Sequence, residues 1–244
     1  MTLSTICLYL TLAACGVLCG VLIIKYDLYR REPWHLVLAA VALGALGMFG
    51  AGELQIVLIR AINASGSQVS NTTLALLAGV TEEAAKFLVV LVIATRRSFD
   101  EPLDGIIFGS LAGLGAALDE SVYYLNYGAP PEYLPPQEPI RLAGHLIMGG
   151  IAGFGLGPLR LKVAHGAAWA AGAFLAAVAL HVAWDLVAFS ASDHHHRTGK
   201  LTPWHTVLPM ALITLGMLTY RHLITVGARM TRVHLKLDDA GAPA

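Results

Sequence analysis

Charged side chains are scarce in this sequence. Asp, Glu, Lys and Arg account for 13% of its 244 residues, about half of the roughly 25% found in soluble domains. Hydrophobic residues account for 56%, and the mean hydropathy is +0.65. The formal net charge is zero, and no basic patch is interleaved with aromatic residues, as nucleic-acid binding would require. The sequence therefore predicts a polytopic membrane protein that binds no nucleic acid.

Cysteine is also rare. Cys7, Cys15 and Cys19 all lie in the first apolar run, a placement that argues against a disulfide framework or a Cys-x-x-Cys metal site. We expect them to be helix-packing residues. A basic segment before this run is missing too, since Lys25 is the first positive side chain. A cleaved secretory signal normally starts with such a segment, so we expect the run to remain as a transmembrane helix.

Long apolar runs dominate the chain. A membrane-spanning helix needs about 20 apolar residues. About seven stretches qualify, at 3–24, 34–59, 72–94, 103–125, 140–157, 166–189 and 204–223. We therefore expect an all-α, polytopic membrane helix bundle of about seven transmembrane helices. It would form one integral-membrane domain over 1–244, with a motif core at about 72–189 and a cytoplasmic tail at 224–244.

The basic residues predict an orientation. Eleven of the 16 Lys and Arg residues lie in the odd-numbered connections and the tail, and four lie in the even-numbered connections. The positive-inside rule then places the N-terminus outside and the C-terminus in the cytoplasm. The longest outer connections are the proline-rich 126–139 and 190–203, which holds His194, His195 and His196. We expect both to be loops and the histidine triplet to be a solvated part of one.

Three ionisable side chains interrupt the third apolar run: Glu82, Glu83 and Lys86. A charge at membrane depth is costly, so three within two helical turns need a reason. The lysine lies four residues after one acid and three after the other, and it can pair with either. One acid would then remain for chemistry. The alternative is a buried ion pair that only holds helices together.

The fourth run combines glycines with acids. Glycines recur every four residues from Gly105 to Gly113, which predicts close packing against another helix. Asp104 lies near the cytoplasmic boundary, where a solvated helix start explains it as well as a supporting role in a site. Asp119 and Glu120 lie deeper and either line the site or pair structurally.

Histidines mark the next two runs. The fifth contains His145, and the sixth contains His181 and Asp185, which share a helix face because they are four residues apart. With about 1.5 Å of rise per residue, these side chains, Glu82 and Glu120 all fall in the outer half of the bilayer. This agreement in depth predicts one site.

Two chemistries suit this set. In the first, Glu82 or Glu83 with His145 activates water for peptide hydrolysis, while His181 with Asp185 binds the carbonyl oxygen. In the second, the two histidines and a carboxylate bind zinc, although the sequence has no His-Glu-x-x-His motif. A non-catalytic scaffold or chaperone that holds partner helices is the other class of function.

The ordered motifs resemble the PrsW family of intramembrane proteases, which is related to the type II CAAX prenyl endopeptidases. The resemblance covers about 81–185 and rests on Glu82-Glu83-x-x-Lys86, Phe99-Asp100-Glu101-x-x-Asp104-Gly105-x-x-Phe108-Gly109, Gly113-x-Gly115, Glu120, His145 and His181-x-x-x-Asp185. It implies a glutamic-type protease without a cofactor, and the zinc set of two histidines and a carboxylate described above stays as the alternative. It also implies a single-spanning substrate, such as a membrane-anchored anti-sigma factor, in the bacterial inner membrane.

The resemblance also implies roles for individual residues. Glu82 and His145 would activate water, and His181 with Asp185 would form the oxyanion site, while Glu83 would support them. The chain departs from the family pattern at Ala116, Ala117, Ser121, Gly149 and Asp185. The last departure matters most, because an ionised Asp has no hydrogen to donate to an oxyanion.

Overall fold

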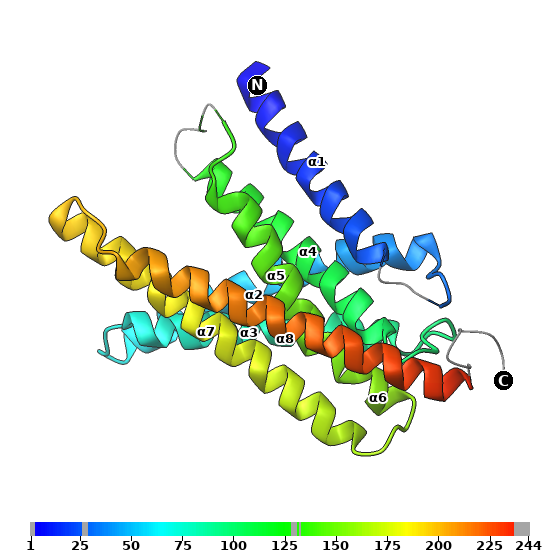
Figure 1. The fold of residues 1–244 in the computed structure, drawn as a ribbon. Helices are drawn as coiled ribbons and strands as arrows, with labels where there is room; N and C mark the ends of the chain where they lie inside the picture. Colours follow the sequence, from blue (N-terminus) through cyan, green and yellow to red (C-terminus); the bar gives the residue numbers. More distant parts are fainter. Residues whose placement is uncertain (1–2, 26–28, 128–130, 132, 237–244) are drawn as a thin grey trace.

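The structure is a computed structural model, and it describes residues 3–25, 29–127, 131 and 133–236. These residues form eight helices and no strand (Figure 1). The helices are α1 (Leu3–Ile24), α2 (Trp34–Ala64), α3 (Asn71–Ile93), α4 (Asp104–Asn126), α5 (Gln137–Phe154), α6 (Leu156–Arg160), α7 (Gly166–Thr198) and α8 (Trp204–Leu235).

The helices confirm an integral membrane protein. Six segments are long and apolar enough to cross a bilayer: α1, α2, α4, α7, α8, and the segment formed by α5 and the short α6. Helix α3 has a comparable 23 residues, but it carries Glu82, Glu83 and Lys86. Large apolar side chains such as Phe49 and Leu175 are more than half exposed, as expected of side chains that face lipid. The all-α bundle is therefore as predicted, and the orientation of its termini stays a prediction.

Some helices extend past the predicted spans. The prediction of a loop at 190–203 is wrong for its first part, because α7 continues to Thr198 and carries the histidine triplet on its last turns. Hydropathy marks the end of the apolar run, whereas the helix ends at Gly199, which adopts a φ of +66°. The predicted tail at 224–244 is likewise helical to Leu235. Residues 237–244 lie outside the described part.

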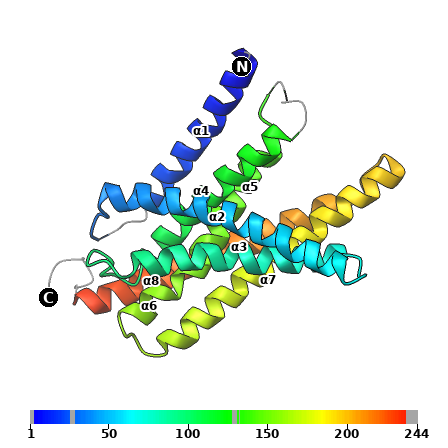
Figure 2. The same cartoon turned by 180° about the vertical axis from the view of Figure 1, so that it is seen from behind.

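Helix α4 forms the centre of the bundle and packs along α5. Figures 1 and 2 show the two helices side by side from opposite directions. The predicted glycine repeat explains how close they come, because a Cβ atom at Gly109 would collide with the backbone carbonyl of Gly149. A Cβ atom at Gly153 would collide in the same way with the carbonyl of Gly105. Only glycine permits this backbone contact.

A second pair is formed by α3 and α7. They approach each other at Gly79, where a Cβ atom would meet the side chain of Val182. Helix α2 packs on both α3 and α4, and α7 also packs on α5. The polar residues of α3 and α7 therefore face those of α4 and α5 inside the bundle.

Candidate active site

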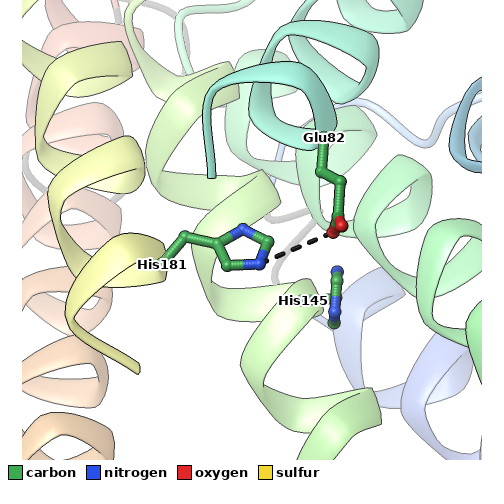
Figure 3. Close-up of side chains that lie close together, drawn as sticks. All are labelled: Glu82, His145 and His181. Atoms are coloured by element: carbon green, nitrogen blue, oxygen red, sulfur yellow. Dashed lines mark ion pairs between the residues drawn. The ribbon is translucent and has the colours of Figure 1, made fainter. Parts of the chain in front are cut away.

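Three helices bring Glu82, His145 and His181 together. The side chains come from α3, α5 and α7, and all three residues are buried, with exposed fractions of 8%, 5% and 3%. One potential ligand atom from each lies within 4.8 Å of the other two. Figure 3 shows the carboxylate and the two rings turned toward one another, with His181 Nε2 3.5 Å from Glu82 Oε2.

Glu83 orients His181. Its Oε1 accepts a hydrogen bond of 2.7 Å from His181 Nδ1, and the residue is fully buried. This bond leaves Nε2 of the ring to face Glu82 and Asp185, whose Oδ2 is 3.6 Å away. The predicted pairing of His181 and Asp185 on one helix face therefore exists, with both residues directed at the same space.

Lys86 pairs with Glu83. The two buried groups form an ion pair within α3, and Lys86 Nζ also lies 3.3 Å from His145 Nδ1. The sequence left open which acid the lysine would engage. In the structure Glu83 is held by both Lys86 and His181, whereas Glu82 has no Lys or Arg partner among the described residues.

Glu82 has one further polar neighbour, Gln55 of α2. Gln55 Nε2 donates to Glu82 Oε1 at 3.3 Å and to Thr81 Oγ1 at 2.9 Å. Glu82 Oε2 is buried and accepts no hydrogen bond from the described residues. One oxygen of this carboxylate is thus fixed by α2, and the other is available toward the two histidines.

Glu120 and Arg141 lie on the other side of His145. Glu120 Oε2 is 2.8 Å from His145 Nε2, within ion-pair distance although not aligned as a hydrogen bond. Arg141 Nε is 3.6 Å from the same oxygen, and Arg141 Nη1 donates to Glu138 at 3.0 Å. The guanidinium also covers the ring of Tyr124 at 4.4 Å.

Sequence reasoning missed Arg141 as a part of the site and used it only to count positive charges. Its position carried a usable signal, because it lies four residues before His145 on α5 and therefore on the same helix face.

Two predicted supporting residues lie apart from this cluster. Asp104 begins α4, sixteen residues before Glu120 and so about 24 Å along the helix. There its Oδ2 accepts a hydrogen bond from the backbone N–H of Glu101. Asp119 neighbours Glu120 in the chain, but it forms no ion pair with any described residue. The structure therefore does not bring Asp104 to the site and leaves Asp119 at its margin.

The cluster has the composition of a metal centre. One carboxylate and two imidazoles are a common catalytic zinc set. Each histidine also has a carboxylate at its other ring nitrogen, Glu83 for His181 and Glu120 for His145, as metal-binding histidines usually do. The same groups could instead activate water directly, because Glu82 keeps one oxygen free.

Comparisons with known proteins agree with these features. Residues 32–217 match a family model described as "PrsW family intramembrane metalloprotease". The chain is 29% identical to Protease PrsW of Bacillus subtilis (strain 168) over 153 residues, 60% of this chain and 68% of the relative. It is 30% identical to Protease PrsW of Geobacillus kaustophilus (strain HTA426) over 182 residues, 72% of this chain and 78% of the relative. No solved structure matches the chain.

The family description names a metalloprotease, the chemistry that the residues offered as the alternative to direct activation of water. Both relatives are named as proteases, which favours an enzyme over a non-catalytic scaffold. The family model covers most of the helix bundle, including every residue of the Glu82, His145 and His181 cluster. The chain therefore belongs to the PrsW family of intramembrane proteases, as an integral protein of the bacterial membrane.

Proposed function

We propose that this protease hydrolyses peptide bonds at a site where Glu82, His145 and His181 hold a divalent metal ion of the zinc type. The observation that carries the proposal is the convergence of these three side chains, from three helices, on one buried space less than 5 Å across. Zinc bound there would polarise a carbonyl oxygen and make water a nucleophile near neutral pH.

The charges around the cluster suit a cation. Lys86 and Arg141 already pair with Glu83, Glu120 and Glu138. Glu82 and Asp185 have only the Nε2 atom of His181 as an ion-pair partner among the described residues. A buried carboxylate without a cation is costly, so the charge of Glu82 has to be neutralised by a metal ion, by a protonated His181 or by a proton on the carboxyl itself, and a metal ion would do this for Glu82 and Asp185 together.

The residues around the ligands would divide the remaining tasks. Glu83 fixes the His181 ring through Nδ1, and Lys86 balances the charge of Glu83. Glu120 lies against the far nitrogen of His145. Asp185 is not a member of the ligand set, and its Oδ2 lies close enough to His181 to take a proton from a water and return it to the leaving amine.

A metal-free version of the same protease is the second candidate. One observation favours it: Lys86 Nζ is 3.3 Å from His145 Nδ1, so an ammonium already lies where the ion would approach that ring. In this version Glu82 Oε2 takes the proton from water and passes it to the leaving amine, and a doubly protonated His181, whose Nδ1 already donates to Glu83, donates from Nε2 to the oxyanion. Lys86 would then supply the positive charge that zinc supplies in the first version.

The proposed substrate is a single-spanning membrane protein, such as an anti-sigma factor, cut near its outer membrane boundary. Two points support it. The cluster lies among membrane-spanning helices, where a substrate helix can reach it by lateral diffusion. The predicted orientation also places the cluster in the outer half of the bilayer, which agrees with extracytoplasmic cleavage.

The test uses the full chain in proteoliposomes with a single-spanning reporter substrate. Glu82→Gln is expected to abolish cleavage and to lower the bound metal, measured by mass spectrometry of the purified protein, from about one ion per chain. Glu53→Gln is the matched control, because Glu53 is an exposed acid of α2 with no ion-pair partner among the described residues. It should leave both cleavage and metal content unchanged.

The outcomes separate the versions. Loss of cleavage on chelation, with recovery on adding zinc, supports the metal site. Full cleavage by metal-free protein, combined with loss in Glu82→Gln, replaces it with the metal-free version. Wild-type cleavage by Glu82→Gln would reject both.

A further inference from the structure

A large groove lies between α1, α5 and α8. It has a volume of about 820 Å³ and is lined by one face each of α1, α5 and α8. Leu22, Leu146 and Leu218 make its walls mostly apolar. Leu22 and Leu218 are also 48% and 60% exposed, so the groove opens sideways toward the bilayer. A space of this kind inside a membrane is filled by a lipid chain or by another helix.

The groove is separate from the candidate active site. His145 faces α4 and α7, where it meets Glu120 and His181. Leu146 and Ile147, the next residues of α5, line the groove instead. Because successive residues of a helix are about 100° apart, α5 presents the catalytic cluster on one face and the groove on another.

Two basic residues line the groove, one from α1's end and one from α8. Lys25 directly follows α1, and Arg221 belongs to α8. Both are exposed, and neither forms an ion pair with another residue in the described part of the chain. Positive-inside counting assigns both Lys25 and Arg221 to the cytoplasmic side, where the leaflet carries anionic lipids.

Arg221 lies deeper than a surface residue. Gly227, six residues later in α8, packs against Leu103 and Phe154, the level at which α4 begins and α5 ends. Arg221 is therefore about 9 Å farther into the bundle. A guanidinium at that depth needs a counter-ion or must extend to the headgroups. No acidic side chain of the described residues lines the groove.

We propose that this groove binds an anionic phospholipid, with its phosphate between Lys25 and Arg221 and an acyl chain along Leu22, Leu146 and Leu218. The lipid supplies both missing parts, an apolar chain for the walls and a negative charge for the two cations. Basic pockets between transmembrane helices hold anionic headgroups in this way. A bound lipid would also pack against the face of α5 that lines the groove, and it would therefore stabilise the helix that carries His145.

The experiment measures lipid binding and does not depend on proteolysis. The full chain is purified in detergent with phosphatidylglycerol or phosphatidylcholine, and retained lipid is counted by native mass spectrometry. We expect one tightly held phosphatidylglycerol and no equivalent phosphatidylcholine. Lys25→Gln with Arg221→Gln should bind phosphatidylglycerol about thirtyfold more weakly.

Two further variants make the test specific. Arg229→Gln with Lys236→Gln removes the same charge from the same end of α8, but neither residue lines the groove. It should retain the lipid. Leu218→Trp keeps both charges and fills the apolar wall, so it should lose the lipid. Each variant is compared with the wild type by thermal unfolding to show that the bundle is intact.

The proposal is overturned if the two double variants bind phosphatidylglycerol equally, or if phosphatidylcholine is held as tightly. It is also overturned if a cysteine at Leu218 crosslinks to the helix of a single-spanning substrate and the lipid does not compete. That result would assign the groove to the substrate.

Discussion

Removing the positive charge of Lys86 should destabilise the bundle strongly. Lys86→Met keeps the length of the side chain and deletes its charge. Glu83 would remain fully buried, with His181 as its only other ion-pair partner among the described residues. Because the pair has side-chain exposures of 1% and 0%, water cannot replace the lost ammonium. Breaking a buried pair by removing one partner costs about 3–5 kcal/mol.

The Lys86–Glu83 pair also forms to some extent in the unfolded state, so folding gains less than the full energy of the pair. Lys86 and Glu83 lie three residues apart on α3, and in detergent this helix persists after the bundle comes apart. An exposed helical pair of this kind contributes about 0.2–0.5 kcal/mol. The coupling free energy between Lys86 and Glu83, measured by a double-mutant cycle, should therefore be about 3 kcal/mol. This is somewhat less than the destabilisation caused by Lys86→Met alone.

The assay is unfolding of the protein in mixed micelles as the fraction of denaturing detergent rises, followed by tryptophan fluorescence. Lys86→Met should unfold far earlier than the wild type, and Glu83→Gln with Lys86→Met should recover at least half of the loss. A loss below about 1 kcal/mol, the size typical of an exposed pair, would refute the reasoning. Additive single and double variants would refute it as well.

Three other predictions test packing, positioning and orientation. Gly109→Ala should destabilise the protein by about 1–3 kcal/mol or more in the same unfolding assay, because its Cβ atom would meet the backbone of α5. Gly172 has open space around it, so Gly172→Ala should be neutral or stabilising. Arg141→Gln should lower kcat/KM by about 10–100-fold, because it releases Glu120 from its place beside His145. Arg141→Lys should restore part of the loss. Equal kcat/KM values for Arg141→Gln and the wild type would contradict this role. Ser67→Cys, in a chain without its native cysteines, should react with an impermeant maleimide added outside intact cells. Labelling only after lysis would show that the orientation is the opposite of the predicted one.

The sequence was sufficient for the bundle because membrane solvation leaves few choices. Every backbone polar group in the bilayer must be bonded within the protein, so each apolar run becomes a helix. The glycine repeat from Gly105 to Gly113 likewise predicted a close helix partner, and α5 is that partner. Hydropathy could not find the true ends of α7 and α8, because a helix continues beyond the membrane until a residue such as Gly199 stops it.

The partners within the polar layer were less predictable. Both Glu82 and Glu83 can reach Lys86 from the same helix, so spacing alone could not choose between them. The choice depends on α7, which places His181 Nδ1 against Glu83 and adds a second bond to the acid that Lys86 holds. Arg141 shows the same limit, since its role appears only when α4 brings Glu120 beside it.

The two halves of the site are each assembled within one helix pair. His145 on α5 takes its neighbouring carboxylate, Glu120, from α4, and these helices are fixed by backbone contact at their glycines. His181 on α7 takes Glu83 from α3, and those helices meet at Gly79. Each histidine thus has its neighbouring carboxylate within its own helix pair.

Across the two pairs, His145 meets Lys86 and His181, and the approach of Glu82 to His145 completes the candidate site. A small shift of one pair against the other would separate these two residues while leaving both oriented histidines intact. If the proposed site is correct, we therefore expect cleavage to depend on the distance between Glu82 and His145 when a substrate helix enters the bundle.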